Sequence, residues 1–390
     1  MKRIMRRRLA AVSIVVAGVM VGVFLARTGT VLGAGPGSGS GAADAAATSW
    51  NREAAAKFLD ERETWWQGWP RAQKDHGTVC ISCHTVVPYA MVRPELRRVL
   101  GDAAMTDPEK TMLESVEKRV GDWAEMAPFY SDEKYGKGKA AESRATEAVL
   151  NAVILASYDR TAGDRARGEV RPVTRTAFDE LWALQEADGP LAGAWKWQDF
   201  HLGPWESAES GYQGAALLMV AAVNLPGGFA QEPGTREHLD RLRDYLRRNY
   251  SAEPVVNRLY VLWASAKEPG LLSSAERKAL VESLRTQQQA DGGFRTAGLD
   301  ARERVDHTAQ ATGSDGYATG LAVLALEAVG TSRRDGTLRW SLDWLARNQQ
   351  SDGTWVAASL NKERDPKSDP ALFMTDAATA YAVMALEGRP

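Results

Sequence analysis

The chain has 390 residues, of which 44% are hydrophobic and 25% charged, and these ordinary globular values exclude a disordered or fibrous protein. Lys and Arg number 48 against 50 Asp and Glu, and six of the basic residues lie within residues 1–34, which hold no acidic residue. The remainder therefore carries 42 basic and 50 acidic groups, a net charge of −8, and a nucleic-acid partner is not expected.

The N-terminal segment has the pattern of an export signal. Five basic residues between Lys2 and Arg8 precede an apolar run of 18 residues, from Leu9 to Ala26. Cleavage after Ala34 would release the protein, but a run of this length can also span a bilayer as an anchor. We expect a signal peptide or signal anchor over 1–34, a flexible linker over 35–49, and an exported protein, either periplasmic or anchored in the inner membrane facing the periplasm.

From residue 50 onward the chain alternates between two kinds of helix. Amphipathic runs, suited to an outer ring, are expected at 52–65, 107–123, 174–185, 236–250, 275–288 and 337–349. Runs that are apolar nearly all round are expected at 79–100, 142–158, 211–222, 256–267, 316–326 and 376–386. Six such hairpins predict an all-α, α6/α6 toroid over residues 50–390, and an open helical solenoid is the alternative.

Three of the connections repeat one pattern, in which Gln is followed by Asp-Gly and then by an aromatic residue. The pattern occurs at Gln185 to Trp195, at Gln288 to Phe294 and at Gln349 to Trp355. We expect the glycine to end each preceding helix and the aromatic ring to pack back against it.

The only two cysteines lie in the motif Cys80-Ile81-Ser82-Cys83-His84. If these residues form one helical turn, both thiols can add to the vinyl groups of a single haem, while His84 binds the iron as proximal ligand. Such attachment takes place outside the cytoplasm, in agreement with the export signal. We therefore expect a covalent haem c held by Cys80, Cys83 and His84.

Two other interpretations of the motif stay open. A tetrahedral zinc site could be built from Cys80, Cys83, His84 and His76, whereas a redox-active dithiol would leave His84 unexplained. The distal position of a haem iron could be vacant, or it could be filled by one of five candidates: Met91, Met126, His201, His307 or Met374.

In the repeated pattern, a glutamine is followed by Asp-Gly, by an aromatic residue and then by a helix of small residues. Over residues 50–390 this pattern resembles the QW repeat of squalene-hopene cyclases and related prenyltransferase toroids. Together with Trp65-Trp66, the Cys-x-x-Cys-His motif and Pro88-Tyr89-Ala90, it resembles exported bacterial squalene-cyclase-like proteins that bear a cytochrome c type motif. The resemblance implies the helical toroid of the terpenoid cyclases and is a weak guide to activity.

The sequence lacks the acidic motifs of active cyclases. Neither Asp-x-Asp-Asp nor Asp-Asp-x-x-Asp occurs, and the nearest stretch, Thr375 to Ala380, has alanines where the family has paired aspartates, so Asp376 is expected to cap its helix. Weak catalytic candidates at the starts of inner helices are Glu206, Glu209, Asp315 and Asp376. With Trp195, Trp197 and Trp205 they could form a ligand site at one mouth of the ring, or they could simply cap helices.

The expected function is that of an exported c-type haem protein, serving electron transfer, haem-based redox chemistry or ligand binding at the toroid mouth. Its expected partners are a periplasmic redox protein and a hydrophobic or isoprenoid small molecule, with membrane contact only through an uncleaved N-terminal segment. The alternatives are a terpenoid cyclase or prenyltransferase acting on an isoprenoid lipid, and a non-catalytic binding module with a Cys/His zinc site. A haem oxidoreductase is the enzymatic option.

Overall fold

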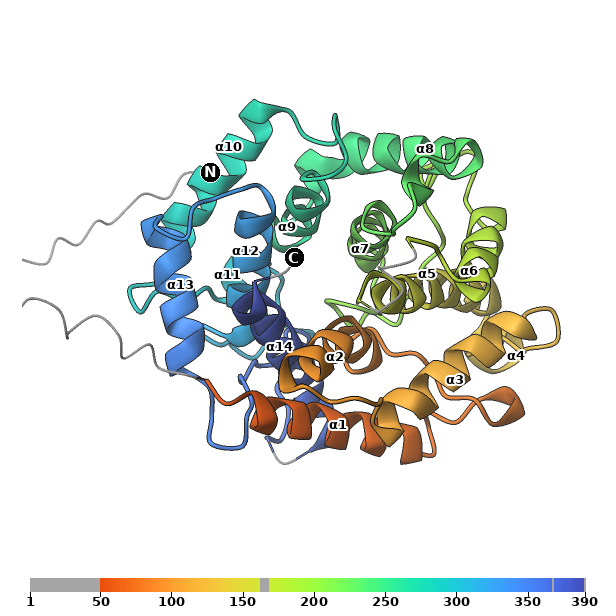
Figure 1. Cartoon of the computed structure of the whole chain (residues 1–390), viewed down its shortest axis with the longest axis horizontal. Helices are drawn as coiled ribbons and strands as arrows, with labels where there is room; N and C mark the ends of the chain where they lie inside the picture. Colours follow the sequence, from red (N-terminus) through yellow and green to blue (C-terminus); the bar gives the residue numbers. More distant parts are fainter. Residues whose placement is uncertain (1–49, 162–167, 367, 389–390) are drawn as a thin grey trace, which may run out of the picture. The chain divides into compact units, whose positions relative to one another are not determined.

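Helices form two concentric rings in the computed structural model, which describes residues 50–161, 168–366 and 368–388 (Figure 1). The inner ring consists of α2 (Val86–Leu100), α5 (Lys139–Thr161), α7 (Ser210–Val223), α9 (Val255–Ala264), α12 (Gly316–Ala328) and α14 (Asp369–Glu387). Each inner helix packs against the next in chain order, and α14 packs against α2. The ring is therefore closed, which confirms the predicted toroid over the open solenoid.

The outer ring surrounds these helices and completes the hairpins. It consists of α1 (Arg52–Gly68), α3 (Asp107–Gly121), α6 (Pro172–Ala183), α8 (Pro233–Asn249), α10 (Ser274–Gln287) and α13 (Gly336–Arg347). Short helical segments lie in the connections: η1 (Asp75–Gly77), α4 (Asp132–Tyr135), η3 (Phe229–Gln231), η4 (Tyr250–Ala252) and α11 (Thr296–Leu299). The described residues contain isolated β-bridges but no strand.

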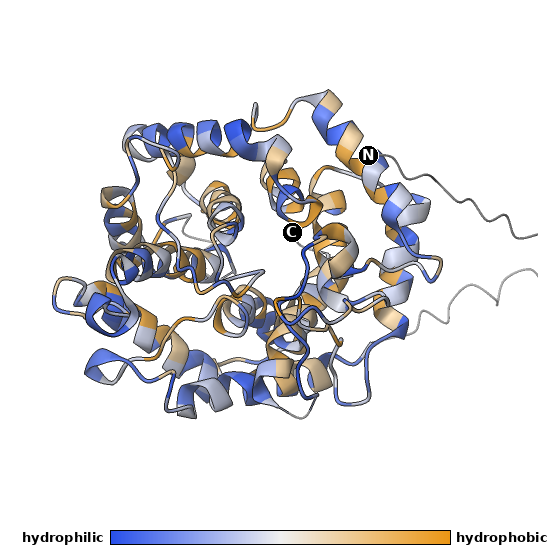
Figure 2. Cartoon of the chain, turned by 180° about the vertical axis from the view of Figure 1, so that it is seen from behind, coloured by the Kyte–Doolittle hydropathy of each residue, from blue (hydrophilic) through white to orange (hydrophobic). Residues whose placement is uncertain are grey.

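Burial follows the predicted difference between the two kinds of helix. Residues 210–220 of α7 are all buried, whereas α8 buries only Thr235, Leu239, Leu242, Tyr245 and Leu246, which lie on one face. Figure 2 shows hydrophobic residues gathered on the inner helices and a mixed pattern on the outer ones. The core thus fills the space between the rings and within the inner ring.

The three repeated connections join neighbouring outer helices through their glutamines. The Nε2 amide of Gln288 donates to the Gly292 carbonyl at 2.8 Å and also to the carbonyl of Thr337, in α13, at 2.9 Å. Gln185 bridges in the same way to His238 of α8, at 3.0 Å. The glutamine side chain, and not the turn alone, thus sets the spacing of successive outer helices.

The last of these glutamines closes the outer ring. Gln349, after α13, accepts from the Asn51 amide at 2.6 Å and donates to the Asn51 carbonyl at 2.8 Å. Because Asn51 is the N-cap of α1, the two hydrogen bonds tie the end of the last outer helix to the start of the first. The sequence repeat therefore also accounts for the closure.

The glycines of the repeat do not end the preceding helices, contrary to the sequence-based expectation: α13 ends at Arg347, well before Gly353. Gly353 instead has φ of +91°, and a Cβ there would lie 2.3 Å from the carbonyl carbon of Ala54 in α1. Its role is close approach to the neighbouring outer helix. The expected packing of the aromatic residue is confirmed, since Trp355 Nε1 donates to the Leu345 carbonyl of α13 at 2.8 Å.

The sequence-based signal or anchor at 1–34 and the linker at 35–49 lie outside the described residues. Within the described ranges, no helix is both long and apolar enough to cross a membrane.

Candidate functional site

The Cys-x-x-Cys-His motif lies in the connection between η1 and α2, not on a helix. Cys80 to Ser82 are non-helical, residues 83–85 form a turn, and α2 begins at Val86, so the expectation that the motif forms one helical turn is wrong. The Ser82 hydroxyl accepts from the amides of Thr85, at 3.2 Å, and Val86, at 3.1 Å. A motif residue thus caps the start of the first inner helix, and this fixes how the chain turns at His84.

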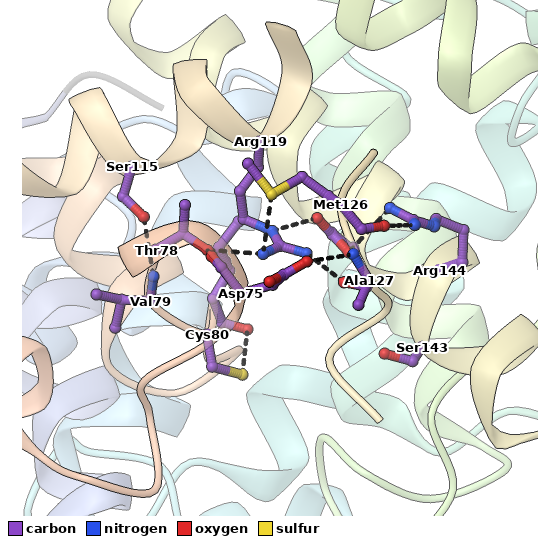
Figure 3. Close-up of polar contacts among 12 residues, drawn as sticks. Asp75, Thr78, Val79, Cys80, Ser115, Arg119, Met126, Ala127, Ser143 and Arg144 are labelled. Carbon is purple, nitrogen blue, oxygen red and sulfur yellow. Dashed lines mark hydrogen bonds and ion pairs between the residues drawn. The ribbon is translucent and has the colours of Figure 1, made fainter. Parts of the chain in front are cut away.

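Helix α3 holds the loop that leads into the motif (Figure 3). Arg119 Nη1 donates to the Thr78 hydroxyl at 2.7 Å, and Ser115 Oγ accepts from the Val79 amide at 3.0 Å. Arg119 is fully buried and its charge is balanced by Glu147 of α5, with Nε and Oε1 2.5 Å apart. Since removal of one partner of a buried ion pair is costly, this loop is held firmly.

The imidazole of His84 is oriented by a chain of polar groups. Its Nδ1 lies 2.8 Å from the hydroxyl of Thr85, and that hydroxyl donates to Asp376 Oδ2 at 2.6 Å. Asp376 is in turn paired with Arg62 of α1, with Nε and Oδ1 2.8 Å apart. Because the Thr85 hydroxyl donates its proton to Asp376, it can only accept a hydrogen bond from His84. The imidazole proton therefore lies on Nδ1, and Nε2 keeps its lone pair.

Aromatic rings enclose the same imidazole. Phe373 stacks on it, with ring centroids 3.9 Å apart and planes 19° apart, and Trp66 meets it edge-on at 5.3 Å. Burial, reinforced by the charge of Arg62, lowers the pKa of His84 to about 3. The ring is therefore neutral near pH 7, as a metal-ligating imidazole must be. Among the described residues, none forms a hydrogen bond with Nε2.

Both thiols are protonated near neutral pH in this fold. Cys80 is only 7% exposed, and burial raises its pKa to about 12. Burial also raises the pKa of Cys83 well above its usual value. A thiol, unlike a thiolate, is a poor nucleophile and metal ligand, so a redox-active dithiol is not favoured.

The residues proposed for the alternative zinc site are not brought together. His76 is half-exposed, and its Nδ1 pairs with Asp75 at 3.0 Å. Over residues 50–161, 168–366 and 368–388, no three His, Cys, Asp or Glu side chains are grouped to hold a metal ion.

Two cavities meet at the motif. The mouth pocket, about 80 Å³ and partly open to solvent, is lined by His84, Phe373 and Met374 together with residues 202–206, 359–361, Arg364 and Pro370. The inner cavity, about 20 Å³, is lined by Cys83, Val87, Val149, Leu150, Trp197, Trp205, Ser210, Gln213, Gly214, Leu217 and Tyr381. Trp205 belongs to both linings.

The donor set fits a covalent haem. Two thiols lie in the required sequence spacing, the imidazole is neutral with Nδ1 occupied and Nε2 free, and His84 lines the mouth pocket.

The five distal candidates lie in different places. Met374, buried on α14, lines the mouth pocket with His84. Met91 lines a separate cavity with Asn224 and Trp263, and Met126 packs against Arg119 with its sulfur 4.0 Å from Nη1. The His201 side chain is 88% exposed beside Asp199, and His307 is exposed in the connection before α12.

The four acidic candidates are also separated. Glu206 lines the mouth pocket, where burial raises its pKa to about 7. Glu209 is exposed and lies outside that lining, and Asp315 is the N-cap of α12, accepting from Ala318 N at 2.9 Å. Only Glu206 is therefore placed beside His84 in a cavity.

Asp376 does not cap its helix, contrary to the prediction. Helix α14 begins at Asp369 after the N-cap Ser368, so Asp376 lies two turns inside it and faces Arg62 and Thr85. Burial raises its pKa to about 6, and the opposing pull of Arg62 limits that rise. Of the three expected aromatic wall residues, Trp197 and Trp205 line the inner cavity, whereas Trp195 donates to the Leu181 carbonyl at 2.8 Å in its own hairpin.

Sequence reasoning missed the groups that orient His84. Arg62 is a charged residue on an outer helix, and Phe373 precedes the apolar part of α14, so neither stands out in the hydrophobic pattern. Thr85 could have been suspected, because a hydroxyl residue next to the motif histidine is well placed to bind its ring nitrogen.

Comparison with known families agrees with this architecture. Residues 313–388, which contain α12, α13 and α14, match the family described as squalene-hopene cyclase C-terminal domain. The fold is a squalene-cyclase-like α/α toroid. No protein of the curated set matches the sequence.

Several solved structures are similar at low identity. A glycosidase variant in complex with glucose is 13% identical, with a TM-score of 0.48, over 87% of this chain and 98% of that one. A family 88 glycosyl hydrolase from Bacteroides vulgatus is 12% identical, with a TM-score of 0.46, over 85% and 98%. A polysaccharide lyase is 13% identical, with a TM-score of 0.34, over 87% and 90%. A likeness at this level says nothing about activity.

Proposed function

We propose that this squalene-cyclase-like toroid is an exported c-type haem protein, in which Cys80 and Cys83 bind the haem covalently and His84 is the proximal ligand. The observation that supports this best is the chain from His84 Nδ1 through Thr85 and Asp376 to Arg62, which leaves Nε2 as the free donor atom. Metal-binding imidazoles characteristically have their other nitrogen bound in this way. The apolar enclosure by Phe373 and Trp66 adds the low-dielectric surroundings that tune a redox centre.

A bound haem would supply one-electron redox chemistry or ligand binding at its iron, and the chain would control both. Met374 is the proposed distal ligand, because it is the one candidate of the five that shares a pocket with His84. Glu206, half-ionised near pH 7, would exchange a proton with solvent at the same mouth. The pocket is partly open, so a small ligand or a periplasmic redox partner can reach it.

Polyprene cyclisation is the less favoured alternative. Alkene protonation requires a strong, neutral carboxylic acid facing the substrate. Asp376 is occupied by Arg62 and Thr85 and lines neither the mouth pocket nor the inner cavity. Incubation with squalene or a shorter polyprene should give no cyclic product, and a product abolished by Asp376→Asn would overturn this view.

Production of the full chain together with cytochrome c maturation factors tests the proposal. The mature protein should be red, recovered from the periplasm or its membrane, and positive for haem stain on a denaturing gel. The double variant Cys80→Ala/Cys83→Ala should lose the stain, whereas His76→Ala, which removes only the fourth residue of the zinc alternative, should keep it. A mature protein whose mass equals that of its amino acids alone, or that contains stoichiometric zinc, would refute haem attachment.

A further inference from the structure

A cleft of about 500 Å³, partly open to solvent, lies between α6 and α8, which are consecutive outer helices in Figure 1. It is far larger than the mouth pocket, at about 80 Å³, and the inner cavity, at about 20 Å³. Small-molecule sites usually have volumes of about 300–1,000 Å³. We call this space the outer cleft; its lining includes Arg175, Asp179, Trp182, Phe229, Thr235 and His238.

Two buried side chains of the outer cleft have hydrogen-bond donors that no described residue accepts. Trp182 is 9% exposed and Thr235 is 7% exposed, yet neither the indole N–H nor the hydroxyl has a partner in the described part of the chain. Other buried indoles differ, since Trp195 and Trp355 each donate to a backbone carbonyl at 2.8 Å. The two unpaired groups are not closed off from solvent, and the cleft is the space that both residues line.

The start of α8 adds two backbone donors to the same space. The first amides of a helix have no acceptor within the helix. The N-cap residue Glu232 does not bond to them, because both of its carboxylate oxygens accept from Arg175, at 2.8 Å. Pro233 has no N–H, and the amides of Gly234 and Thr235, two residues of the lining, donate to no described residue. The cleft is therefore rich in unpaired donors.

The outer cleft also offers acceptors. Gln185 Nε2 donates to the carbonyls of Gly193 and His238, each at 3.0 Å, so its Oε1 accepts from His238 Nδ1, which lies 2.6 Å away. His238 Nε2 is left as an acceptor, because burial lowers the pKa of the ring and keeps it neutral near pH 7. The exposed Asp179 carboxylate forms no hydrogen bond or ion pair with a described residue.

The charges of the lining favour a neutral ligand. Arg175 has one positive charge against the two negative charges of Asp179 and Glu232, so an anion would be repelled. A cation would be attracted but would leave the indole, hydroxyl and amide donors without an acceptor. A hydroxyl group both accepts and donates, so a molecule with several hydroxyl groups satisfies donors and acceptors together. The rings of Trp182 and Phe229 provide apolar contacts for its C–H groups.

We propose that the outer cleft binds a neutral sugar, whose hydroxyl groups accept from Trp182 and Thr235 and donate to Asp179 and His238. A pyranose ring combines hydroxyl groups at its edge with C–H groups on its faces, as this lining requires. No residue of the outer cleft belongs to the Cys-x-x-Cys-His motif or lines the mouth pocket, so the inference goes beyond the haem proposal and is independent of it. Ordered water is the competing occupant.

Titration of the full chain with glucose, galactose and mannose, followed by saturation-transfer NMR and calorimetry, tests the inference. At least one of these neutral hexoses should bind. Its uronate, in which a carboxylate replaces the hydroxymethyl group, should bind at least about fivefold more weakly because of Asp179 and Glu232. The 2-amino sugar, a cation of similar shape, should not bind more tightly than the hexose.

Two results of this titration would overturn the proposal. Absence of binding by all three hexoses would mean that the cleft holds only water. Tighter binding of the uronate or the amino sugar would mean that the ligand is charged. Neither result depends on haem, which is detected separately by its stain, so failure of this inference is distinguishable from failure of haem attachment.

Three variants locate the sugar. Thr235→Val removes the hydroxyl with little change of shape and should weaken hexose binding about fivefold, the equivalent of one hydrogen bond. Thr174→Val is the matched control, because Thr174 on α6 is also buried with an unpaired hydroxyl but does not line the cleft, so the affinity should stay the same. Asp179→Asn should bring the uronate to within about twofold of the hexose.

Equal affinities of Thr235→Val and Thr174→Val for the hexose would show that the sugar binds elsewhere. Should Thr235→Val fail to fold, as judged by circular dichroism, Asp179→Asn decides, because Asp179 is exposed and its replacement leaves the buried residues unchanged. An unaltered preference for the hexose over the uronate in Asp179→Asn would then overturn the proposal.

Discussion

The hydroxyl of Thr85 can be removed almost without a change of shape, by Thr85→Val. The variant loses the hydrogen bond from His84 Nδ1, at 2.8 Å, and the one to the Asp376 carboxylate, at 2.6 Å, and both groups stay buried or half-buried. A neutral hydrogen bond is worth about 1 kcal/mol and one to a charged group about 1.5–3 kcal/mol. Since Asp376 keeps Arg62, we expect a loss of roughly 2–3 kcal/mol in the free energy of unfolding.

Thr379→Val is the matched control, because Thr379 is buried on the same helix as Asp376 but accepts only from the Trp355 amide, at 3.2 Å. It should cost about 1 kcal/mol. Urea unfolding monitored by circular dichroism measures both variants. In the haem-loaded protein, Thr85→Val should also raise the midpoint potential, since an imidazole without its Nδ1 partner donates less electron density to iron, whereas Thr379→Val should not. Equal stability losses in the two variants, or an unchanged potential in Thr85→Val, would refute the proposed orientation chain.

Three further perturbations have definite expected outcomes. Gly353→Ala should destabilise by more than about 2 kcal/mol, because its Cβ would meet the backbone of α1, whereas Gly336→Ala, with no atom within 4 Å, should be neutral or slightly stabilising in a thermal melt. Burial raises the pKa of Glu63 to about 8, so between about pH 4.5 and 8 the folded state keeps a proton that the unfolded state releases. The free energy of unfolding should therefore fall as the pH rises through this range. Glu63→Gln should remove that part of the pH dependence and melt higher than the parent protein at pH 8. Met374→Leu should change the absorption spectrum of the haem-loaded protein, whereas Met91→Leu, in a separate cavity, should not.

The alternation of helix types made the fold predictable. A run with one apolar face indicates an outer helix, and a run that is apolar all round indicates an inner helix. Six such pairs suffice to close a ring. The repeated glutamine was recognised as a marker of the connections between helices. Its hydrogen bond to the next outer helix was not predicted, because the acceptors are the backbone carbonyls of His238, Thr337 and Asn51, whose side chains have nothing in common. Every residue has a backbone carbonyl, so the sequence does not indicate which one accepts the hydrogen bond.

The site was less predictable for the same kind of reason. The motif itself is visible in the sequence, and Thr85 is adjacent to it, whereas Arg62 lies on the preceding outer helix and Phe373 and Asp376 come from the last helix. Only ring closure, which packs α14 against α2 and α1, brings them together. The role of Asp376 was predicted wrongly because the apolar run begins at residue 376, whereas helix α14 already begins at Asp369.

Burial of the motif constrains the order of events if the haem is attached covalently. Thioether formation needs accessible cysteines, yet in the closed ring Cys80 is 7% exposed, and burial holds the thiol pKa of both cysteines above the usual value. Attachment must then precede closure, which the last hairpin completes through Gln349 and Asn51. A haem already bound to the loop before α2 would become enclosed when α14 brings Phe373 and Met374 to it. In this order α14 both closes the toroid and completes the surroundings of His84.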